Sequence, residues 1–153
     1  MHPIEHPFFG RGRSSEEAES TSDGGPVVNG LLVSSAGPFV KRVNGVSASF
    51  MATIAGDARG LLVGGLLTAV ERRFVGVSGG LMNNALEGDG LMMGAWTGVV
   101  DLHGVQIGAV NRSVQTRGVQ LGLYNVSRTL RGLQLGLLNR TPERILPLVN
   151  WRF

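Results

Sequence analysis

The residues whose chemistry could support a metal site lie close together at the start of the chain. His2, Glu5 and His6 have the spacing that places two imidazoles on one face of a helix, where they can hold a metal ion. Pro3 and Pro7 interrupt that spacing, because proline lacks a backbone donor and clashes inside a helix. The segment therefore predicts no metal site.

No other group of residues indicates catalysis. His103 is close to Asp101 in a turn-like segment, which is the ordinary setting of a surface histidine. The sequence has no cysteine and no Gly-x-Ser-x-Gly elbow, and its single lysine, Lys41, belongs to no phosphate-binding motif. We therefore predict a protein that is not an enzyme and that needs no cofactor.

A repeat of fourteen residues dominates the second half of the chain. Residues 104–108, 118–122 and 132–136 each read Gly-x-Gln-(Leu/Ile)-Gly, and an asparagine follows three residues after each unit. Looser units can be traced back to Gly30, where the spacing lengthens to fifteen or sixteen residues. An internal period of this kind predicts a repeat architecture.

Apolar and polar residues alternate within each unit. Val119, Leu121 and Leu123 share one face of an extended chain, and Gln120 and Tyr124 share the other. Period-two alternation is typical of a strand with one buried face. The 24 glycines among 153 residues also disfavour helices. We expect an all-β repeat protein with units of about fourteen residues.

Two architectures suit such a unit. In a β-solenoid each unit is one coil, and coils stack about 4.8 Å apart; in a small antiparallel β-barrel each unit is a strand and a turn. The constant length of the later units favours the solenoid, because a change of length breaks the rows between coils. The barrel is the alternative, since the ending Trp151-Arg152-Phe153 resembles the C-terminal assembly signal of outer-membrane barrels. Against it, each apolar stripe holds only three residues, whereas a lipid-facing strand needs about nine to eleven.

Stacking in register predicts ladders of amide side chains that satisfy one another along the column. The predicted ladder residues are Gln106, Gln120, Gln134, Asn111, Asn125 and Asn139. Residues 145–153 are expected to form a capping strand. In the solenoid, Trp151 and Phe153 would cover Leu135 and Leu137 of the last coil; in the barrel, they would face lipid as the assembly signal.

Charge and composition distinguish the N-terminal segment of the chain from its C-terminal half. Residues 1–26 are polar and acidic and are expected to form a flexible tail before a repeat domain at 27–144. From Gly104 onward seven arginines accompany one acid, Glu143. The partners this suggests are an anionic surface or glycan, a membrane, and further copies of the chain through unpaired strand edges. Nucleic acid is not expected, because no aromatic residues are interleaved with the arginines.

The Gly-x-Gln-(Leu/Ile)-Gly-x-x-Asn units of residues 104–139 resemble those of bacterial surface-repeat proteins. The ending Leu-Pro-Leu-Val-Asn-Trp-Arg-Phe, residues 146–153, is similar to the way many such chains finish. The resemblance implies a non-catalytic structural or adhesive protein of the cell envelope or surface, and it implies no active-site residues. Residues 1–26 show no apolar segment typical of a secretory signal.

Overall fold

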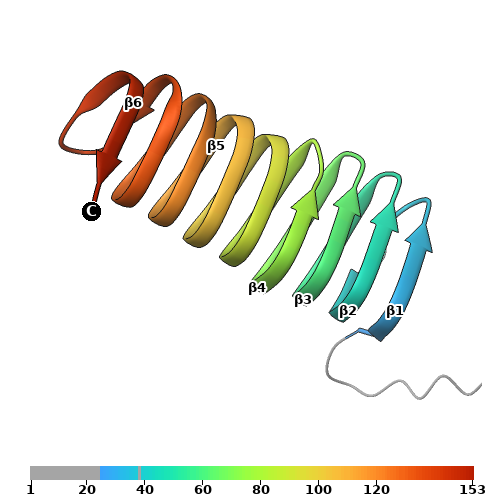
Figure 1. Cartoon of the computed structure of the whole chain (residues 1–153). Helices are drawn as coiled ribbons and strands as arrows, with labels where there is room; N and C mark the ends of the chain where they lie inside the picture. Colours follow the sequence, from blue (N-terminus) through green and yellow to red (C-terminus); the bar gives the residue numbers. More distant parts are fainter. Residues whose placement is uncertain (1–24, 38) are drawn as a thin grey trace, which may run out of the picture.

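The computed structural model describes residues 25–37 and 39–153, which wind into one column of stacked coils (Figure 1). The elements are β1 (Val27–Ser34), β2 (Phe39–Ser49), β3 (Ala52–Gly64), β4 (Leu67–Gly79), β5 (Met82–Arg140) and β6 (Ile145–Arg152). The all-β prediction is confirmed. His2, Glu5 and His6 lie outside the described residues, as does the predicted tail apart from its last two residues.

Successive coils stack as parallel strands. β1 pairs with β2 and β2 with β3 at an offset of fifteen residues, as between Val27 and Arg42. One register shift in the β3–β4 pairing and one in the β4–β5 pairing absorb the unequal lengths of the early units. β5 then runs for 59 residues through several coils. Its side-chain contacts join residues fourteen apart, as the repeat predicts.

The sheet is an open stack. Strand order follows chain order from β1 to β6, and within the described residues β1 and β6 are not neighbours. A barrel closes only when its first and last strands pair. The β-solenoid prediction is therefore confirmed, and the antiparallel barrel is wrong. Only β6 is antiparallel, and it pairs with the last stretch of β5 at the C-terminal end of the column (Figure 1).

A row of glycines forms one corner of every coil. These residues have φ values between 114° and 144°, a region that side chains rarely adopt. Their backbones also approach closely: a Cβ added at Gly118 would lie 2.0 Å from the carbonyl oxygen of Gly104. The corner glycines are Gly30, Gly45, Gly60, Gly76, Gly90, Gly104, Gly118 and Gly132.

The interior changes character along the column. The N-terminal coils are filled by apolar side chains, and Leu62, Phe74 and Met92 have no exposed surface. In the C-terminal coils the buried residues are mostly polar: Gln106, Asn111, Ser113, Thr116, Gln120, Asn125, Ser127, Gln134 and Asn139. Burial of apolar surface thus stabilises the first coils, and hydrogen bonding stabilises the last ones.

The apolar side of the alternation faces outward in these later coils. Gln120 is fully buried, whereas Leu123 is 58% exposed, and Val119 and Leu121 are only partly covered. The interior of a short coil is narrow, and stacked amides fill it while satisfying their hydrogen bonds along the column. The repeat thus buries its polar face and leaves its apolar face on the surface.

Candidate binding surfaces

The predicted glutamines form a continuous buried ladder. Gln120 Nε2 donates to Gln106 Oε1 at 2.6 Å, and Gln134 Nε2 donates to Gln120 Oε1 at 2.7 Å. Asn150 of β6 extends the row, because its Nδ2 donates to Gln134 Oε1 at 2.8 Å. All four residues are fully buried. The fourteen-residue period does not predict Asn150 as a ladder residue, because β6 is antiparallel and lies outside that spacing.

The predicted asparagines form a second ladder. Asn111 Nδ2 donates to Asn125 Oδ1 at 2.7 Å, and Asn125 Nδ2 donates to Asn139 Oδ1 at 2.8 Å. Asn111 and Asn125 each donate also to a backbone carbonyl of the next coil, at 2.8 and 2.9 Å. Thr97 begins the row, and its hydroxyl donates to Asn111 Oδ1 at 2.6 Å.

Both ladders lie inside the column, so their role is structural. Their donors point in opposite directions, toward the N-terminus in the glutamine row and toward the C-terminus in the asparagine row. Gln106 Nε2, at the end of its row, has no hydrogen-bond partner among the described residues. The residue at this position in the preceding coil is Met92, whose sulfur is a weak acceptor.

β6 closes the column through Asn150 and leaves its aromatic residues outside. Trp151 lies opposite Leu133 and is 58% exposed, and Phe153 is fully exposed. Leu137 is also 62% exposed. The expectation that Trp151 and Phe153 cover the last coil is thus corrected: the strand is a cap, but its buried side chain is an amide that continues the glutamine ladder.

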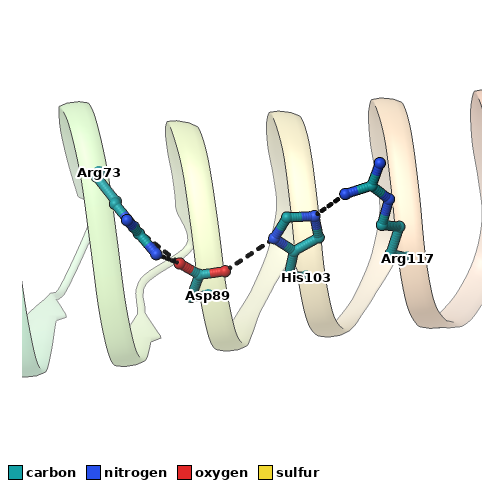
Figure 2. A network of polar contacts seen from close by, with 4 residues as sticks. All are labelled: Arg73, Asp89, His103 and Arg117. Carbon is teal, nitrogen blue, oxygen red and sulfur yellow. Dashed lines mark hydrogen bonds and ion pairs between the residues drawn. The ribbon is translucent and has the colours of Figure 1, made fainter.

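A row of charged and polar side chains joins four coils along one edge (Figure 2). Arg73 Nε donates to Asp89 at 2.8 Å, His103 Nδ1 lies 3.0 Å from Asp89, and Arg117 donates to His103 Nε2 at 2.9 Å. Burial acts to raise the pKa of Asp89, but the hydrogen bonds from Arg73 and His103 outweigh it and lower that pKa. His103 thus contacts the acid one coil earlier rather than its sequence neighbour Asp101.

Each coil presents two outward positions, one and three residues after the corner glycine, that carry no polar side chain. We call the resulting surface the apolar face. It has no charged residue, and its exposure is greatest at Leu31 and Val33, at 70% and 71%. It consists of Leu31, Val33, Val46, Ala48, Leu61, Val63, Val77, Gly79, Leu91, Met93, Val105, Ile107, Val119, Leu121, Leu133 and Leu135, with Val149 and Trp151 of β6.

A concave site of about 450 Å³ opens on the return half of the C-terminal coils. We call it the arginine groove. Its lining includes Trp96, Val110, Arg112, Tyr124, Val126, Arg128 and Arg140. In the sequence Tyr124 is the one aromatic residue between Arg112 and Arg140, and stacking of the coils brings Trp96 to the same group. This corrects the sequence-based premise that the arginines lack aromatic neighbours.

The described residues contain no group of three or more His, Asp or Glu side chains placed to hold a metal ion. Within the same residues no helix has the length and apolar character needed to span a membrane. Comparisons with known protein families, with curated proteins and with solved structures find no match to this chain.

Proposed function

We propose that this chain is a non-catalytic structural repeat protein of the cell envelope or surface, and that it works as a rigid element joined to a second copy through the apolar face. The continuity of that face carries the proposal. Soluble proteins seldom leave an apolar patch of this extent uncovered. The envelope location rests on the resemblance of residues 104–153 to bacterial surface repeats.

The dimensions of the apolar face suit a protein interface. Eight coils and β6 contribute nine strands, and at about 4.8 Å per strand the face is about 40 Å long. Each coil crosses the face with about four residues, and at about 3.3 Å per residue the face is about 13 Å wide, which gives roughly 500 Å² in plane. Because the side chains protrude from this plane, the accessible area is larger than the area in plane. It approaches the ~800 Å² that each partner buries in a stable complex.

A second copy fits this face better than it fits the exposed edge of β6. β6 carries Pro147, which lacks an N–H, and Leu148 has a φ of 63°, which interrupts the extended backbone. Irregularities of this kind protect a strand edge from pairing. Two flat apolar sheets, by contrast, pack face to face about 10 Å apart, as the layers of a β-sandwich do.

The double variant Val77→Lys with Ile107→Glu tests this proposal. Both side chains point outward from the apolar face, two coils apart, and the pair of changes leaves the net charge unaltered. Burying these charges would be costly, so we expect the variant to be monomeric where the unmodified chain forms dimers. Sedimentation velocity over a range of protein concentrations measures the difference.

The matched control is Leu86→Lys with Val114→Glu, which makes the same changes two coils apart on the return half of the coils. It should associate as the unmodified chain does. A monomeric unmodified chain at all concentrations, or equal loss of association in both variants, would refute face-to-face pairing.

A further inference from the structure

Three arginines of the arginine groove have no counter-ion in the part of the chain that the structure describes. Arg112, Arg128 and Arg140 are exposed, and none has a hydrogen-bond or ion-pair partner among residues 25–37 and 39–153. The described residues that line the groove include no acid. Like charges gathered without compensation repel one another, so an anion that enters the groove relieves that repulsion.

The arrangement favours an extended ligand over a single small anion. Arg112, Arg128 and Arg140 belong to three consecutive coils, and at about 4.8 Å per coil their backbones span about 10 Å along the column. A single phosphate or sulfate ion would have to draw the three guanidinium groups together against their mutual repulsion. A linear polymer that lies along the column can present one anionic group after another.

Apart from Ser127 and Thr141, the remaining lining is aromatic and aliphatic. Trp96 is 43% exposed, Tyr124 is partly covered, and they lie two coils apart with the shorter Val110 between them. Val126 lies between Arg112 and Arg140 in the same way. Long side chains thus flank shorter valines, which leaves a hollow between them. The valines give the hollow an apolar floor, on which the face of a sugar ring can pack.

We propose that the arginine groove binds a segment of acidic polysaccharide, with guanidinium groups on its carboxylates or sulfates and a sugar ring against Trp96 or Tyr124. Arginine suits both anions, because its planar fork donates two hydrogen bonds at once. Nucleic acid fits less well. The affinity of a protein for nucleic acid grows with the number of phosphates that it neutralises, and this groove offers three arginines.

The groove is independent of the proposed dimer. Gln120, beneath the apolar face, contacts Ser113 of the return half across the interior. The groove therefore lies on the other side of the core and stays open when the apolar face is covered. Glycan binding can therefore be measured in the Val77→Lys, Ile107→Glu variant, which is expected to be monomeric. The result tests the groove whether or not the proposed dimer forms.

Binding is measured by the fluorescence of Trp96 in a Trp151→Phe background, where it is the only tryptophan. The probes are short alginate chains, dextran sulfate, neutral dextran and oligothymidylate. We expect the acidic glycans to bind and to change the fluorescence, and the tighter of the two identifies the preferred anion. The triple variant Arg112→Gln, Arg128→Gln, Arg140→Gln should bind about tenfold or more weakly.

A control triple variant, Arg42→Gln, Arg59→Gln, Arg131→Gln, removes the same charge elsewhere on the column. It should retain affinity within about twofold, because distant exposed charges are screened. Equal loss of affinity in both triple variants would mean that only the net charge of the chain matters, and it would overturn the proposed binding site. Tighter binding of oligothymidylate, or equal binding of neutral dextran, would overturn the class of ligand.

Discussion

Gly118→Ala is expected to lower the free energy of unfolding by about 3 kcal/mol or more. At φ 143° a side chain strains the backbone, and the new Cβ would lie 2.0 Å from the carbonyl oxygen of Gly104. That oxygen belongs to the backbone of the preceding coil and cannot turn away. The coils would have to separate at this corner, which also weakens the neighbouring ladder bonds. Urea unfolding followed by circular dichroism measures the loss.

Gly79→Ala is the matched control. Gly79 occupies the apolar face, its φ is not in the left-handed region, and an added Cβ would meet no atom within 4 Å. The change should alter stability by no more than about 0.5 kcal/mol. Similar losses in the two variants would show that the corner geometry described for Gly118 is wrong.

Asn125→Leu is expected to cost a similar amount, about 3 kcal/mol or more. The change removes an acceptor used by Asn111 and a donor used by Asn139 and by a backbone carbonyl, in a site with no access to water. Each buried polar group left unpaired costs about 1–3 kcal/mol.

Asn83→Leu gives the comparison at the equivalent position three coils earlier, outside the hydrogen-bonded row. Asn83 accepts a hydrogen bond from Ser78 at 2.6 Å and donates only a long one, at 3.5 Å, to a backbone carbonyl. It lies near the apolar part of the interior, where a leucine finds suitable neighbours. In the same urea experiment, Asn83→Leu should lower the free energy of unfolding clearly less than Asn125→Leu does. Equal losses at Asn83 and Asn125 would mean that the ladder contributes nothing beyond ordinary burial.

The sequence predicts the column well because coils of equal length leave a regular period. The spacing of fourteen residues is sufficient to pair Gln106 with Gln120 and Asn111 with Asn125, as the structure does. Alternation alone cannot show which face is buried, since Val119 and Gln120 occupy equivalent extended positions on opposite sides. That choice depends on the interior, where glycines beside the amides leave room for ladders.

The binding surfaces are harder to predict because they combine residues from several coils. Trp96 and Tyr124 are 28 positions apart in the sequence, and neither lies next to an arginine of the groove. Stacking of the coils, combined with the outward alternation on their return half, brings these side chains into one groove. The same holds for the apolar face, whose residues appear in the sequence as ordinary core positions.

The most direct test of the account measures the exposure of the apolar face itself. The chain has no cysteine, so Val77→Cys and Leu86→Cys each introduce a single thiol, one on the apolar face and one across the column from it. Face-to-face pairing predicts that the rate of maleimide labelling at position 77 falls as protein concentration rises, while the rate at position 86 does not change. Labelling rates that are independent of concentration at both positions would contradict the proposed assembly.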